Sequence, residues 1–139
     1  MKLEAILMAN AATIDANSLL NVKGSCWRFV ERAEFPETIG GSVCGTILIE
    51  DEDFGAIHVV SADVFDDSGH VEGATGSVLF NCLEPSSEMT TPRLAFAIPF
   101  ATVIHEPTVL KASVKSDGDE LGALSVIVRR PAAPTDPVA

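Results

Sequence analysis

The sequence predicts an all-β domain in which two antiparallel sheets pack as a sandwich, Ig-like or jelly-roll-like, with eight or nine strands. Three observations predict this fold class. The apolar stretches are rich in β-branched and small residues, turn residues interrupt them about every 8 to 15 positions, and helical periodicity is hard to find. The chain has 139 residues, within the span of one domain. We expect that domain over residues 1–130 and a flexible Pro/Ala-rich tail over 131–139.

The first half of the chain predicts six strands. Four are separated by Gly24, by Gly40-Gly41 and by an acidic turn over residues 50–53. The other two form a hairpin around Asp66-Asp67-Ser68-Gly69, a turn in which glycine accepts positive φ. The six expected strands cover residues 3–14, 19–23, 26–30, 43–49, 56–65 and 70–80.

The next strand alternates large and small side chains. Its large residues are Leu94, Phe96, Ile98 and Phe100, and its small residues are Ala95, Ala97, Pro99 and Ala101. Because proline cannot donate a hydrogen bond to a ladder, we expect this strand to lie at a sheet edge or to be bulged at Pro99. An alanine-rich edge could pair with a partner, which makes these four small residues a candidate interaction edge. The alternative is that Pro99 protects the edge.

The C-terminal hairpin has the clearest local signal. Residues 108–116 and 124–128 alternate apolar and polar side chains, so each presents one buried face and one wetted face. Asp117-Gly118 lies between them in a position typical of tight hairpin turns.

The net charge of the chain and its cysteines indicate which binding partners and which cellular compartment to expect. Nine Lys and Arg against 20 Asp and Glu give a net charge of -11, which argues against nucleic acid and anionic membranes as partners. Cys26, Cys44 and Cys82 are odd in number and lack C-x-x-C spacing, and their apolar surroundings suit core thiols. They predict a reducing compartment, so we expect the protein to be cytoplasmic.

No motif indicates catalysis or a cofactor. G-x-S-x-G, Walker and H-E-x-x-H patterns are missing from the sequence, so we expect no enzyme, no metal and no cofactor. Asp66 and Asp67 beside Gly69 lack the ligand spacing of a calcium loop. His58 and His70 lie on the two arms of one predicted hairpin and could converge, although surface histidines are the simpler interpretation.

Three functional hypotheses follow. The first is a non-enzymatic interaction module that binds a protein partner or itself, as a homodimer, through a sheet edge or face. The second is a small-molecule or peptide binder with a pocket near Trp27, the only tryptophan in a chain without tyrosine, although core burial is the commoner fate of such a residue. A metal-dependent hydrolase built from scattered His and Asp residues ranks last.

The N-terminal third resembles a group of small bacterial β-sandwich proteins known only as a domain of unknown function. The resemblance lies in residues 4–10, residues 19–24, Trp27 and Phe35-Pro36, and it weakens through the rest of residues 2–130. Ser18 departs from the pattern, in which a glycine often precedes the Leu-Leu-Asn stretch. The resemblance implies a fold and a bacterial, cytosolic setting, and it transfers no functional residues.

Overall fold

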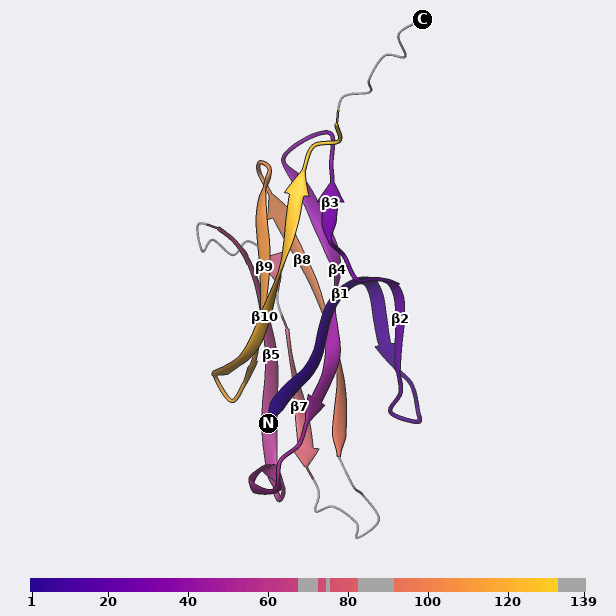
Figure 1. Ribbon diagram of the computed structural model, residues 1–139, viewed down its shortest axis with the longest axis vertical. Helices are drawn as coiled ribbons and strands as arrows, with labels where there is room; N and C mark the ends of the chain where they lie inside the picture. The colour runs from indigo at the N-terminus through magenta and orange to yellow at the C-terminus, as the bar shows by residue number, and fades with distance from the viewer. Residues whose placement is uncertain (68–72, 75, 83–91, 133–139) are drawn as a thin grey trace, which may run out of the picture.

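A computed structural model of the chain describes residues 1–67, 73–74, 76–82 and 92–132. Over these residues the fold is all-β, with ten strands in two five-stranded sheets and one short 3-10 helix, η1 (Asp51–Asp53) (Figure 1). The predicted two-sheet class is confirmed. Nine of the strands have three or more residues, as the sequence indicated, and the tenth has two. Within the described part, no helix is long and apolar enough to cross a membrane.

The first sheet is antiparallel throughout. Its strands, in spatial order, are β2 (Leu20–Ser25), β1 (Lys2–Ile14), β4 (Glu37–Leu48), β8 (Arg93–Ile104) and β6 (Gly73–Ala74). β4 and β8 pair along their whole length without a register shift. β4 begins six residues earlier than expected, because Gly40 and Gly41 continue the strand instead of interrupting it.

The second sheet is mixed. Its strands, in spatial order, are β3 (Phe29–Glu31), β10 (Asp119–Arg129), β9 (Thr108–Ser116), β5 (Ala56–Asp66) and β7 (Ser77–Cys82). β3 joins β10 in parallel, the one described pairing that departs from the expected antiparallel pattern. The β9–β10 hairpin matches the prediction, and Asp117 and Gly118 both have positive φ, 52° and 90°, as a tight hairpin turn requires.

The antiparallel pairing of β5 with β7 confirms that the two arms of the predicted hairpin are neighbours. The two strands pair from Ala56 opposite Cys82 to Ser61 opposite Ser77. In the described part the end of β5 pairs with β9 alone, and the chain then visits the first sheet as β6 before it returns as β7. The two arms therefore separate beyond Ser61 and Ser77, and Ser68 and Gly69 of the expected turn lie outside the described residues.

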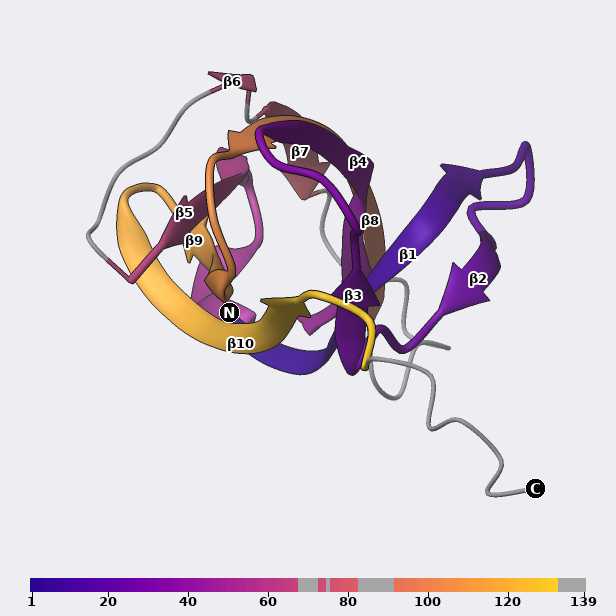
Figure 2. The ribbon, with the colours of Figure 1, turned by 90° about the horizontal axis from the view of Figure 1, so that it is seen from above.

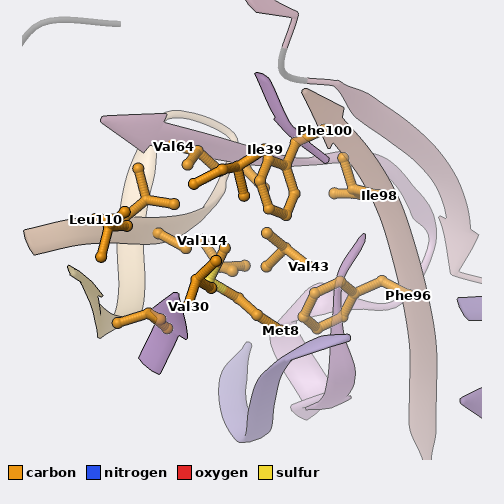
Figure 3. Packing of buried hydrophobic residues seen from close by; sticks show 14 of the residues in the cluster. Met8, Val30, Ile39, Val43, Val64, Phe96, Ile98, Phe100, Leu110 and Val114 are labelled. Carbon is orange, nitrogen blue, oxygen red and sulfur yellow. The ribbon is translucent and has the colours of Figure 1, made fainter. Parts of the chain in front are cut away.

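The core lies between the inner faces of the two sheets (Figure 3). Phe96 and Phe100 of β8 are the largest side chains in it, and each lies opposite a glycine of β4, Gly45 and Gly41 respectively. A side chain at Gly41 would meet Trp27 and the backbone of Ala9, and one at Gly45 would meet the backbone of Ala5, so both positions require glycine. The fully buried partners include Met8, Ile39, Val43, Val64, Leu110 and Val114.

One part of the first sheet leaves the sandwich. β1 pairs with β4 from Lys2 to Ala9, and it pairs with β2 from Ala9 to Ile14. Figure 2 shows this two-stranded hairpin standing away from the two packed sheets. We call residues 9–25 the arm, its turn over residues 15–18 the tip, and the end near Ala9 and Ser25 the base.

Candidate functional site

The predicted interaction edge lies on β8, the fourth strand of the first sheet. Opposite its β4 side, β8 pairs in the described part only with β6, through Ala101 and Thr102. Pro99 lies opposite Ser42 in a continuous register, so the strand has an edge there and not a bulge. Pro99 and Ala101 are exposed, whereas Ala95 and Ala97 are half-buried. That a partner binds this edge stays a prediction.

Trp27, the predicted pocket residue, lies where the arm joins the sandwich. Its indole N–H donates to the side-chain oxygen of Asn10 at 3.0 Å and to the carbonyl of Gly24 at 3.1 Å. Its ring meets Phe100 edge-on, with centroids 6.1 Å apart. Trp27 is half-buried and packs against the core, and that a ligand binds beside it stays a prediction.

A hollow of about 190 Å³ opens beside Trp27, and we call it the Trp27 hollow. One wall is Asn10 at the base of the arm, and the opposite wall comes from β3. Phe29 is 47% exposed there, and the guanidinium of Arg129 lies 3.9 Å from the centre of its ring. The lining residues are Asn10, Trp27, Phe29, Val30, Glu31 and Arg32.

The arm carries an apolar face that sequence reasoning missed. Ala12 lies opposite Val22 and Ile14 opposite Leu20, with no register shift back to Ala9. Because side chains alternate along a strand, these four residues share the face of Met8, which points into the core, and of Asn10, which holds Trp27. Ile14 is 41% exposed and Val22 is 36% exposed. We call Ala12, Ile14, Leu20 and Val22 the arm face.

The arm face is thus the core-facing side of the first sheet continued past the end of the sandwich. Inside the sandwich this side is covered by the second sheet, whose nearest strand, β3, has only three residues. The sequence signal was only partial, since Leu20-Asn21-Val22-Lys23 alternates apolar and polar residues, whereas Ala11-Ala12 interrupts the alternation in β1. Alternation shows which face is apolar, but it does not show which element covers that face.

The tip of the arm is well ordered by Asp15. Its carboxylate accepts hydrogen bonds from the backbone N–H groups of Asn17 (2.8 Å) and Leu19 (3.0 Å) and from the side-chain amide of Asn21 (3.1 Å). The bond from Asn21, followed by that from Leu19, lowers the pKa of Asp15 below its usual 3.8. Asp15 at the tip and the Trp27 bonds at the base fix the hairpin at both ends.

His58 is engaged at both ring nitrogens. Nδ1 lies 2.7 Å from the carboxylate of Asp117, and Nε2 lies 2.7 Å from the backbone carbonyl of Asp53. Both neighbours accept hydrogen bonds, so both nitrogens must donate, which favours the imidazolium. The bond to Asp117 is the main cause that raises the pKa of His58 above 6.5. His70 lies outside the described residues, so its convergence with His58 stays a prediction.

The thiols differ from the expectation at one position. Cys44 and Cys82 are buried, and burial raises the pKa of Cys44 to about 11 and raises that of Cys82. Cys26 was expected in the core but is exposed, because it lies in the segment that links the arm to Trp27, with a positive φ of 63°. All three cysteines are free.

A larger hollow of about 460 Å³ lies at the turn between β8 and β9. Its polar lining includes Asp66 at the end of β5, Asp67 directly after it, and His105 and Glu106 in the turn. Among the residues that the structure describes, no group of three or more His, Cys, Asp or Glu is close enough to hold a metal ion. This hollow therefore offers no metal centre within that part of the chain.

Comparison with known proteins returned no match: no family model, no curated protein and no solved structure is similar to this chain at a significant level. The resemblance to a bacterial domain of unknown function therefore stays a prediction.

Proposed function

We propose that the protein is a non-enzymatic interaction module that binds a protein partner or a second copy of itself through the arm face and the adjoining Trp27 hollow, together the arm site. One observation carries the proposal: a hairpin fixed at both ends projects from the sandwich and presents an apolar face on which Ile14 and Val22 are exposed and Ala12 and Leu20 are half-buried. The module then acts by docking, with a sheet face as the binding surface.

Burial of the arm face by a partner would stabilise the hairpin. A two-stranded hairpin alone is marginally stable in water, and burial of apolar surface contributes about 25 cal/mol per Å². Polar Thr13 separates Ala12 from Ile14, and polar Asn21 separates Leu20 from Val22, as in a strand pair that buries one face. A partner on that face would supply the missing burial without deforming the arm, because Asp15 and Trp27 already hold its shape.

The polar groups described above support a non-enzymatic role. His58 has both nitrogens bound to acceptors, which leaves it no lone pair for a substrate. The buried Cys44 and Cys82 have raised pKa values and so a small thiolate fraction. The three free thiols also support the proposal of a reducing, cytoplasmic setting.

A second candidate function is peptide binding at the Trp27 hollow alone. Sites for drug-sized ligands measure about 300 to 1,000 Å³. The Trp27 hollow, at about 190 Å³, is smaller and suits one or two side chains of a peptide better than a whole small molecule. The β8 edge at Ala95–Ala101 ranks below both, since Pro99 and the pairing with β6 already protect part of it.

Photo-crosslinking in cells tests the proposal. A benzophenone side chain replaces Val22 on the arm face, and in a matched control it replaces Thr13, which lies on the opposite face of the same hairpin. We expect irradiation to join the Val22 variant to another polypeptide and to leave the Thr13 variant at the mass of one chain. Equal yields at the two positions, or no adduct at either, would contradict the proposal.

A further inference from the structure

The arm face is uncharged in a strongly acidic protein. Ala12, Ile14, Leu20 and Val22 carry no charge, while the whole chain has a net charge of -11. The Trp27 hollow adds one charge of each sign, Glu31 and Arg32, so the arm site has no net negative charge that would favour a basic partner. A second copy suits the arm face, because an uncharged apolar face is complementary to itself.

Charges at the two ends of the arm set a direction. Asp15 lies at the tip and is exposed, and Arg28, also exposed, follows Trp27 at the base. If two arms pack antiparallel, the tip of each lies near the base of the other, and Asp15 approaches Arg28. A parallel arrangement would bring like charges together. Exposed pairs contribute only about 0 to 1 kcal/mol, so they select the orientation while the apolar face supplies the attraction.

The shape of the arm site also favours antiparallel packing of the two arms. The pair of Ile14 and Leu20 forms the tip end of the arm face, and the Trp27 hollow lies at its base end, beyond Asn10. An antiparallel pair of arms brings the aliphatic tip of one copy to the hollow of the other. About 190 Å³ is room for aliphatic side-chain ends between the rings of Trp27 and Phe29. In the middle, Ala12 and Val22 are small enough for the two arms to approach closely.

From these observations we propose that the occupant of the arm site is a second copy of this chain, packed with two-fold symmetry and antiparallel arms, so that Ile14 and Leu20 of each copy fill the Trp27 hollow of the other. This inference rests on the proposed function and names its partner. It replaces the expected dimer edge on β8 with a contact made by β1, β2 and β3.

The size of the contact sets the expected affinity. Two strands about 4.8 Å apart and six residues long present a face of roughly 200 Å², well below the ~800 Å² per partner of a standard interface. The Trp27 hollow adds to this area but does not close the gap. We therefore expect a reversible dimer with a Kd between about 10 µM and 1 mM.

Sedimentation equilibrium of the purified full chain, from about 5 µM to 1 mM, measures this association. We expect the average mass to rise with concentration from 14.6 kDa toward twice that value. Val22→Glu places a charge in the contact and should raise the Kd about tenfold or more. Thr13→Glu adds the same charge to the opposite face and should leave the Kd within about twofold.

Ile14→Glu repeats the test at the tip if Val22→Glu fails to fold, as judged by circular dichroism. A chain that stays monomeric to about 1 mM overturns the proposal, and so does a dimer that folded Val22→Glu and Ile14→Glu variants leave unchanged. The mass of the crosslinked adduct distinguishes the proposed function, docking through the arm site, from the inference that the occupant is a second copy.

An adduct of twice the chain mass supports the second copy. A Val22 adduct of another mass supports the proposed function and refutes self-association, and the absence of any adduct refutes both.

Discussion

Gly41 makes room for the side chain that fixes the base of the arm. A methyl group on its Cα would lie 2.5 Å from the carbonyl oxygen of Ala9 and 2.7 Å from Cη2 of Trp27, closer than side chains pack. Ala9 is the residue at which β1 leaves β4 for β2. The absent side chain of Gly41 therefore lets Trp27 lie against the sheet exactly where the arm departs, and links core packing to the position of the arm.

Gly41→Ala should displace Trp27 and destabilise the fold by about 1 to 3 kcal/mol, the usual cost of overpacking. Because Trp27 is the sole tryptophan, its emission should shift to longer wavelength as the ring gains solvent. Chemical denaturation and fluorescence measure both effects. Gly40→Ala is the control, since its methyl group would approach nothing closer than 3.4 Å. Unchanged emission and stability in Gly41→Ala would show that Trp27 does not depend on this glycine.

The hydrogen bonds of His58 make the free energy of unfolding depend on pH. Its pKa is raised above 6.5, chiefly by the hydrogen bond to Asp117. A raised folded-state pKa contributes stability that is complete below the unfolded value and is lost as pH rises through the folded value. The pKa of Asp117 is lowered below 3.8, chiefly by the backbone N–H of Val59, so its contribution is lost as pH falls through that lowered value.

We therefore predict that the free energy of unfolding falls as pH rises from about 6 to 9, and that His58→Gln flattens this part of the profile. Urea titrations at a series of pH values measure it. Asp117→Asn should flatten the same range, because it removes the partner that raises the pKa. If the wild type and His58→Gln lost the same free energy over this range, the imidazolium would not be the cause.

The conformation of the arm is stabilised by hydrogen bonds within it and at its base more than by burial of its side chains. Its tip depends on Asp15, and its base on the contact of Trp27 with Asn10 and Gly24. Gly24, with φ of 63°, has no side chain where that of Asn10 lies. An element of this kind exchanges its amide hydrogens through local opening and not through global unfolding.

Asp15→Ala should loosen the arm while the sandwich keeps its stability. Loss of the bonds to the amides of Asn17 and Leu19 should speed hydrogen exchange in residues 9–25 by about fivefold, at about 1 kcal/mol for a lost hydrogen-bond cap. Amides of β9 and β10 should be unaffected. Asn17→Ala is the control, because it shortens a side chain of the same turn and keeps the bonds to Asp15. Equal exchange in Asp15→Ala and the wild-type arm would refute the role of Asp15.

Sequence reasoning predicted the elements whose cause is local and missed those whose cause is distant. The β9–β10 hairpin follows from alternation on both sides of Asp117-Gly118, and it was predicted correctly. The early start of β4 was missed, because Gly40 and Gly41 resemble a break until Phe100 and Trp27 are known to lie beside Gly41. The visit of β6 to the first sheet and the departure of the arm depend on the topology of both sheets, which periodicity does not encode.

At the scale of the whole molecule, the asymmetry between the two sheets is what leaves the arm face open. The first sheet continues to Ile14 and Leu20, whereas the second ends at the short strand β3. The Trp27 hollow lies where the first sheet continues beyond β3, the last strand of the second sheet, and we call this place the step. A second copy that packs its arm at this step adds the missing layer through the uncharged arm face.

Acrylamide quenching of Trp27 fluorescence as a function of protein concentration tests this account most directly. Acrylamide is neutral, so the net charge of the protein does not repel it. If the tip of a second copy fills the Trp27 hollow, the quenching constant should fall as the concentration rises through the dimer Kd, and it should stay constant in Val22→Glu. A quenching constant that is the same at all concentrations while the wild type dimerises would contradict the account.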